Sequence, residues 1–218
     1  MKKKVLVVLA GCGVRDGSEI QESVVTLLAL DRAGVEAVCA APNITSSQCV
    51  DHFRGTVTQE SRNVLTESAR IARGEIVPLG QIKPAEIDAV VLPGGLGVAT
   101  NLSNFHTAKE EATVEPTLKN LLLTVQAAGK PLGFLCLAPV IAAILFGAQG
   151  LRYTIGDDEE LAAKLARYGA QHVNCAPTDA VTDAKLKIVT TPAFMLAERL
   201  SELETGVDKL VSELLKLA

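Results

Sequence analysis

The sequence is poor in aromatic residues, and this limits what the protein can bind. Aromatic residues make up 3% of the 218 residues, and tryptophan is absent. Proteins that bind single-stranded nucleic acids stack the bases on aromatic side chains, so this class of partner is not expected. The net charge of −4 also argues against binding to a phosphate backbone or to an acidic membrane surface.

The sequence also lacks paired cysteine motifs. No two cysteines are spaced as C-x-x-C, and none follows the ligand spacing of a zinc site, so no metal is predicted. An odd number of widely spaced cysteines indicates free thiols in a reducing compartment. The five are Cys12, Cys39, Cys49, Cys136 and Cys175.

Long hydrophobic runs are missing as well, and no segment is long enough to span a membrane. The apolar run Val5 to Ala10 follows three lysines, and Leu9 to Cys12 resembles a lipoprotein cleavage site. An export signal has an apolar region of about 7–15 residues, whereas this run is shorter. We therefore interpret it as a first buried parallel strand.

What the sequence does contain is a regular alternation of strands and helices. Hydrophobic residues make up 48% and charged residues 21%, which suits a globular core. This alternation predicts an α/β fold with a mostly parallel sheet, helices on both faces and ligand chemistry at the carboxyl ends of the strands. The predicted strands are 5–9, 35–40, 89–92, 131–135, 152–155, 171–174, 180–182 and 186–190. The predicted helices are 18–33 (capped by Ser18), 61–73, 115–128, 139–146, 159–168 and a last region to 217 broken near Gly206, with 44–58 as an insertion.

Cys136 lies at the most informative turn. The apolar run 131–135 predicts a buried strand, and Pro139 suits the first residue of a helix. A cysteine between them matches a nucleophile elbow, where the helix N-terminus favours a thiolate over a thiol. The alternative interpretation is a cysteine packed in the core, because free cysteines are often buried.

Four loops should meet near this cysteine: 11–22, 93–104, 136–139 and 190–193. Gly94 and Gly95 allow a close approach of the backbone to a ligand, although a plain tight turn would look the same. The N–H of Leu137 follows the nucleophile, as in the oxyanion holes of elbow-type enzymes. These loops therefore predict a site for negative charge.

Two glutamates are candidates for the proton partner of the thiol. Glu19 and Glu22 are three residues apart on the first predicted helix and so share a face. A carboxyl group buried beside Cys136 would have a raised pKa and could exchange a proton with the thiol or the substrate. Both would otherwise be ordinary surface residues at a helix start, and the spacing does not decide between them.

Several segments resemble, in order and over essentially the whole chain, one known group of proteins. They are 11–22, 88–97, 101–105, 131–139 and 188–193. The resemblance is to the ElbB-type proteins, also called enhancing lycopene biosynthesis or isoprenoid biosynthesis amidotransferase-like proteins. These belong to the class I glutamine amidotransferase-like superfamily, beside PfpI and the Parkinson-associated deglycase. The resemblance implies one domain over residues 1–218, a flavodoxin-like three-layer sandwich, a homodimer, a cytoplasmic location and no cofactor.

The resemblance also implies roles for individual residues. The family nucleophile falls on Cys136, its paired glutamate on Glu22, and the oxyanion donors on Gly95 and Leu137. The chain departs from amidotransferases by placing Leu137 where a histidine follows the cysteine, so glutamine hydrolysis is not expected. His172 fits a structural role, whereas His106 lies in a polar loop that could face the site. The residues assigned to substrate binding around these are Gly94, Asn101, Glu19 and Cys12, the last of which is equally explained as a packed loop residue.

Bacterial members of the group are described as glyoxalases that do not need glutathione. The resemblance therefore implies a lyase that converts glyoxal, a small dicarbonyl, to glycolate through the Cys136 thiolate and Glu22. Two alternatives remain open. One is a redox sensor in which Cys136 is oxidised. The other is a scaffold protein linked to isoprenoid metabolism.

Overall fold

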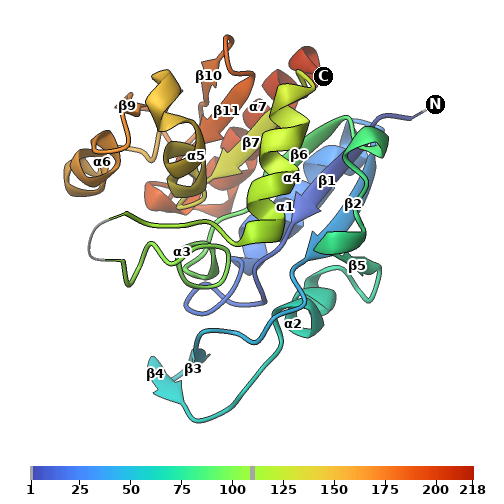
Figure 1. The fold of residues 1–218 in the computed structure, drawn as a ribbon, viewed down its shortest axis with the longest axis vertical. Helices are drawn as coiled ribbons and strands as arrows, with labels where there is room; N and C mark the ends of the chain where they lie inside the picture. The colour runs from blue at the N-terminus through green and yellow to red at the C-terminus, as the bar shows by residue number, and fades with distance from the viewer. Residues whose placement is uncertain (1, 109–110) are drawn as a thin grey trace.

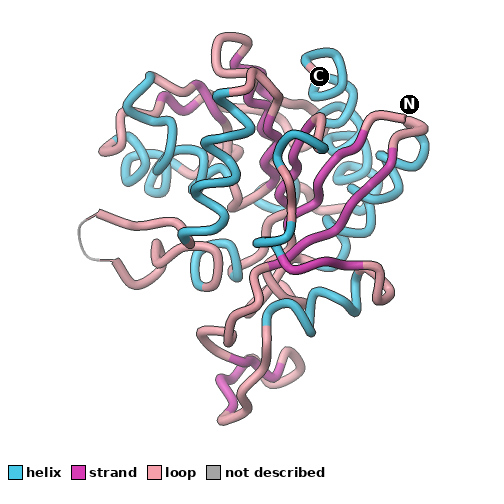
Figure 2. Tube along the Cα trace, turned by 45° about the vertical axis from the view of Figure 1, so that its right-hand side comes forward, coloured by secondary structure: helices cyan, strands magenta, loops and turns pink. Residues whose placement is uncertain are grey.

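A seven-stranded sheet forms the centre of the computed structural model, which describes residues 2–108 and 111–218 (Figures 1 and 2). The strand order is β10-β11-β7-β6-β1-β2-β5. All neighbours pair in parallel except β10 and β11, which form a hairpin. The predicted α/β flavodoxin-like fold is confirmed. The strands are β1 Lys4–Val8, β2 Glu36–Ala41, β5 Ile76–Pro78, β6 Ala89–Leu92, β7 Leu132–Leu135, β10 Val181–Asp183 and β11 Ile188–Thr191.

Helices cover both faces of the sheet, and the alternating side chains of β1 show why (Figure 1). Leu6 and Val8 point into one apolar cluster, and Val5 and Val7 point into the other. The first cluster lies under α4 (Pro116–Ala127) and α5 (Pro139–Phe146), and the second under α1 (Ile20–Arg32) and α7 (Leu200–Leu217). Among the described helices, none is long and apolar enough to cross a membrane.

Smaller elements lie outside the main sheet. Residues 44–58, predicted as an insertion, contain the hairpin β3 (Cys49–Asp51) and β4 (Thr56–Thr58), which projects from the body in Figures 1 and 2. The predicted strands at 152–155 and 171–174 form a separate parallel pair, β8 (Arg152–Tyr153) and β9 (Gln171–His172). The remaining helices are α2 (Val64–Ile71), α3 (Gly97–Thr100) and α6 (Glu159–Ala166), and short 3-10 turns lie at Leu79–Gln81, Pro84–Glu86, Gly147–Gln149 and Ala193–Met195.

The first two turns of helix α1 bury polar side chains and expose apolar ones, whereas its end buries Ala29 and Leu30. Glu22 and Thr26 are fully buried, whereas Ile20 and Val24 are 44% and 50% exposed. Its N-cap is Glu19 rather than the predicted Ser18, whose hydroxyl instead accepts a hydrogen bond from the Ala10 N–H. The rotation of this part of the helix therefore follows the contacts of Glu22, and the spacing of its apolar residues does not predict it. The homodimer implied by the sequence stays a prediction.

Helix α7 is continuous through Gly206, where a break was predicted. The glycine is needed for packing, because a Cβ there would collide with the carbonyl oxygen of Pro177. Helix formation alone would favour alanine over glycine by roughly 1 kcal/mol. Overpacking against backbone costs about 1–3 kcal/mol and outweighs this gain.

Gly206→Ala should therefore lower the free energy of unfolding by about 1–2 kcal/mol, measured by urea denaturation. Gly80→Ala is the matched control. Its added methyl group would meet only Thr117, at an ordinary 3.9 Å, so we expect little change. A Gly206→Ala protein as stable as the parent would contradict the packing explanation.

Candidate active site

Cys136 occupies a strained turn between β7 and α5. Its φ is +56°, in the left-handed region that residues other than glycine rarely adopt. The Cys136 N–H donates to the Thr191 carbonyl at 3.0 Å, and the Ala138 N–H donates to Leu135 at 2.8 Å. Since α5 begins at Pro139, these bonds fix the cysteine at the carboxyl edge of the sheet. This is the geometry of a nucleophile elbow, and the thiol-bearing residue is 8% exposed.

Gly94 brings the end of β6 against the same cysteine. A Cβ at this position would lie 2.5 Å from the Cys136 Cβ and 2.8 Å from the Glu22 Oε2. Only glycine leaves room for both side chains. The Gly94 carbonyl also accepts a hydrogen bond from the Glu19 N–H at 2.9 Å, which ties the start of α1 to this loop.

Glu22 is the acid that the structure brings to Cys136. Its carboxyl group accepts hydrogen bonds from the N–H groups of Gly94 (2.8 Å) and Phe194 (3.3 Å) and lies beside the Cys136 thiol, which acts to lower its pKa. The side chain is completely buried, and this burial raises the pKa of Glu22 to about 7. Glu22 therefore gains or loses its proton close to neutral pH.

The pKa of the Cys136 thiol is raised, against the sequence-based expectation of a thiolate stabilised by the helix end. Burial and the negative charge of Glu22 raise it, whereas the N–H groups of Gly95 and Leu137 lower it. The expectation of a low thiol pKa was wrong because it took no account of the burial of the sulfur or of the negative charge of Glu22 beside it. Because the thiol and the carboxyl group are adjacent and the pKa of each is raised, a thiolate can form here by transfer of the thiol proton to Glu22.

Glu19, the other candidate acid, has a different position. Its carboxylate accepts a hydrogen bond from the Glu22 N–H at 2.6 Å and so caps α1. Its negative charge contributes to the raised pKa of Glu22. Glu19 thus has two effects: it caps the N-terminus of α1, and its charge raises the pKa of Glu22.

Two other predicted site residues serve different contacts. The Asn101 amide donates to the carbonyls of Ala10 and Asp16, both at 2.9 Å, and accepts from the Ser47 N–H at 2.9 Å. Asn101 therefore joins three loops, and its amide group is occupied by these contacts and not by Cys136. Cys12 lines a separate small pocket beside Cys49, and burial raises the pKa of its thiol.

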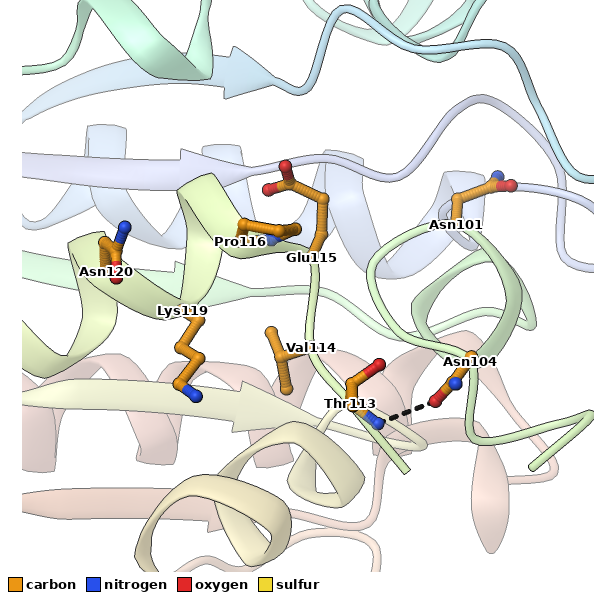
Figure 3. Close-up of a pocket in the computed structure, with 8 residues that line it drawn as sticks. All are labelled: Asn101, Asn104, Thr113, Val114, Glu115, Pro116, Lys119 and Asn120. Carbon is orange, nitrogen blue, oxygen red and sulfur yellow. Dashed lines mark hydrogen bonds between the residues drawn. The ribbon is translucent and has the colours of Figure 1, made fainter. Parts of the chain in front are cut away.

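Asn101 also borders a cavity of about 620 Å³ at the start of α4 (Figure 3). In Figure 3 the Thr113 N–H donates to the Asn104 Oδ1, at 2.6 Å, across one side of this cavity. Neither Cys136 nor Glu22 lines it. A second cavity, of about 780 Å³, is lined by Leu137 and so borders the elbow.

Among the described residues, no hydrogen bond joins a histidine to Cys136 or Glu22. His172 packs edge-on against Tyr153, with ring centroids 5.5 Å apart, which fits the structural role predicted for it. His106 lies in the wall of the cavity beside Leu137. The groups that affect the pKa of Cys136 are Glu22 and backbone N–H groups. Within residues 2–108 and 111–218, no cluster of acidic, histidine and cysteine side chains is suited to hold a metal ion.

Phe194 is a site residue that the sequence did not reveal. Its N–H reaches Glu22 because the preceding Ala193 adopts a φ of +48° in the turn after β11. The loop 190–193 was expected at this edge, but nothing in its residue types indicates which N–H points at the acid.

Comparison with known proteins gives relatives across the whole chain. The rat "ES1 protein homolog, mitochondrial" is 39% identical over 99% of this chain and 84% of its own length. The human "Glutamine amidotransferase-like class 1 domain-containing protein 3, mitochondrial" is 39% identical over 98% and 83%. No protein-family model matches the chain.

These names contradict the cytoplasmic location implied by the sequence. The curated relatives from rat, human and zebrafish are all named as mitochondrial. The free thiols indicate a reducing environment, but they do not distinguish one reducing compartment from another. The prediction of a cytoplasmic protein is therefore withdrawn.

Solved structures point to the same group. The crystal structure of an isoprenoid biosynthesis protein with an amidotransferase-like domain from Ehrlichia chaffeensis has a TM-score of 0.92 at 36% identity, covering 99% of this chain and 100% of that one. Drosophila melanogaster DJ-1beta shares the fold, with a TM-score of 0.58 at 20% identity over 100% and 96% of the two chains. The resemblance inferred from the sequence is confirmed: the chain belongs to the family of ES1 and ElbB-type isoprenoid biosynthesis proteins with a class I glutamine amidotransferase-like domain.

Proposed function

We propose that the chain is a cofactor-independent glyoxalase that converts glyoxal, and related small 1,2-dicarbonyls, to the hydroxy acid. The observation that carries this proposal is the burial of Cys136 against Glu22, so close that Gly94 between them has no room for a Cβ, with the N–H groups of Gly95 and Leu137 beside the sulfur. A nucleophile, a proton carrier with a pKa near neutrality and a site for an oxyanion are what this reaction needs.

The reaction begins when the Cys136 sulfur attacks one aldehyde carbon and forms a C–S bond. The carbonyl oxygen gains the electron pair, and the N–H groups of Gly95 and Leu137 stabilise its charge. Glu22, which holds the thiol proton at this stage, donates it to that oxygen. The product of the step is a neutral hemithioacetal beside an ionised Glu22.

Glu22 then moves a second proton between the two carbons. It removes the proton from the carbon bonded to sulfur, which gives an enediolate with its charge on the second oxygen. A proton is then returned to the neighbouring carbon, and the hydroxyl proton of the first carbon passes to the second oxygen. The first carbon is thereby oxidised to a thioester and the second is reduced to an alcohol. Water hydrolyses the thioester, releases glycolate and restores the thiol, so that glyoxal and water give glycolate and one proton without an external oxidant.

Glutamine hydrolysis fits this site less well. It needs a histidine that activates the cysteine and later protonates the leaving amine. The residue after Cys136 is Leu137, and the side chain beside the thiol is the carboxyl group of Glu22. We therefore propose that this chain uses its amidotransferase-like fold for the conversion of dicarbonyls and not for the hydrolysis of glutamine.

The test is to incubate the protein with glyoxal in D₂O, without glutathione and with a chelator, and to follow the products by NMR. We expect glycolate with one deuterium on its carbon, because the proton carried by Glu22 exchanges with solvent. Glycolate without deuterium on its carbon would indicate an intramolecular hydride transfer instead of the enediol route. Absence of glycolate above the protein-free rate would refute the proposed function.

A further inference from the structure

The cavity of about 780 Å³ is lined by one of the two oxyanion donors and by the residue next to the other. Leu137 lines it and supplies one of these N–H groups. Leu96 lines it as well and follows Gly95, which supplies the other. Cys136 and Glu22 do not line this cavity themselves, but Leu137, the residue after the nucleophile, does.

The cavity is larger than glyoxal requires. Pockets of roughly 300–1,000 Å³ enclose whole drug-sized ligands, whereas glyoxal has four non-hydrogen atoms. Near the elbow the walls are apolar, formed by Leu96, Ala99, Phe105 and Leu137. These walls suit the carbon chain of a longer substrate.

Helix α6 supplies cationic side chains to the same cavity. Lys164 and Arg167 both line it, and their spacing of three residues places them on one face of the helix end. Lys164 already hydrogen bonds Glu160 at 2.7 Å. Within residues 2–108 and 111–218, Arg167 forms no salt bridge, and Glu111 is the acidic residue of the described cavity lining. The described lining of this cavity thus carries two cationic side chains and one carboxylate.

We infer that the preferred substrate class is a 1,2-dicarbonyl with an anionic arm, a carboxylate or a phosphate, which Arg167 binds while the dicarbonyl end reacts at Cys136. This inference rests on the proposed function. A guanidinium group binds such anions through two parallel hydrogen bonds. The chemistry is unchanged: the aldehyde carbon becomes a carboxylate, the ketone carbon becomes an alcohol, and one water is consumed.

The experiment compares 4,5-dioxopentanoate with its methyl ester, which has the same reacting end and no charge. We expect the parent protein to prefer the acid by about tenfold in kcat/KM. Arg167→Gln should remove this preference through KM, and Arg167→Lys should keep part of it. Arg152→Gln, which changes an exposed arginine outside the cavity lining, is the matched control and should keep the full preference. Competitive inhibition by glutarate and by glycerol 3-phosphate will show whether the site prefers a carboxylate or a phosphate.

Equal kcat/KM values for the acid and its ester, or a preference unchanged in Arg167→Gln, would overturn the inference and leave glyoxal turnover untouched. If glyoxal is not converted, the proposed function fails. A binding measurement then tests separately whether Arg167 binds the anionic arm of a ligand. In that case 2-hydroxyglutarate is titrated calorimetrically into the Cys136→Ala protein. Binding weakened about tenfold by adding Arg167→Gln supports the arm site, and absent or Arg167-independent binding overturns it.

Discussion

Cys136→Ala should lower kcat/KM for glyoxal at least a thousandfold, to near the protein-free rate. The thiol is the one nucleophile at the elbow, and without it no hemithioacetal forms beside Glu22 and the two N–H donors. Loss of the nucleophile in other covalent enzymes costs about this much or more. The measurement is glycolate formation under saturating and limiting glyoxal.

Two variants make this result specific. Cys136→Ser keeps a hydroxyl of similar size but is a weaker nucleophile, so it should also lose turnover. Cys175→Ala removes a partly exposed thiol whose sulfur contacts the neighbouring Ala176 carbonyl, and it should retain the parent rate. Thermal unfolding followed by circular dichroism checks that each variant is folded. Turnover by a folded Cys136→Ala protein at the parent rate would leave Cys136 without a catalytic role and would revive the scaffold alternative.

Glu22→Gln is expected to lower kcat/KM by a factor of about 10² to 10⁴, the range of general acid–base catalysis. It should also change the pH dependence. In the parent protein the pair reaches its reactive, singly protonated form as pH rises through about 7, the pKa to which burial raises Glu22. Activity should therefore rise with pH below 7 and level off above it. In Glu22→Gln this rise should move to higher pH, because the thiol must ionise without the carboxyl group.

The same substitution has an expected effect on stability with a defined sign. The folded protein binds the Glu22 proton more tightly than the unfolded chain, whose carboxyl has an ordinary pKa of 4.5. The parent therefore loses stability as pH rises from 4.5 through 7, by up to about 3 kcal/mol. Glu22→Gln should not show this loss, which urea unfolding at pH 5 and pH 8 will measure. Glu86→Gln, on an exposed turn, is the control, and equal pH dependence of activity and stability in Glu22→Gln and the parent would contradict proton transfer between Cys136 and Glu22.

The parts of the fold that were predictable from the sequence rest on local signals. The turn at Cys136 follows an apolar run and precedes Pro139, and α5 has the predicted bounds. Strand β5 was not predicted, because Ile76–Pro78 is three residues long and ends in a proline. Helix α7 was expected to break at Gly206, since the collision that requires glycine involves Pro177, far away in the sequence.

The loops that form the site could be predicted from the sequence, but the positions of the side chains within it could not. The choice between Glu19 and Glu22 depends on the rotation of α1, which has polar residues inside and apolar residues such as Val24 outside. The raised pKa of Cys136 depends on its depth, which no residue pattern reports. Asn101 has the right position in the sequence for a ligand contact, yet its amide holds loops together.

The hydrogen bond from Phe194 to Glu22 joins residues 172 positions apart, and the other partners lie at Gly94 and Cys136. Contacts of such wide sequence separation form late, after most of the chain has been ordered. During synthesis, the set of contacts around Glu22 can be completed only after Phe194 has been added to the chain. A chain truncated before Phe194 would therefore lack one of the two backbone N–H groups that hold the Glu22 carboxyl group beside Cys136.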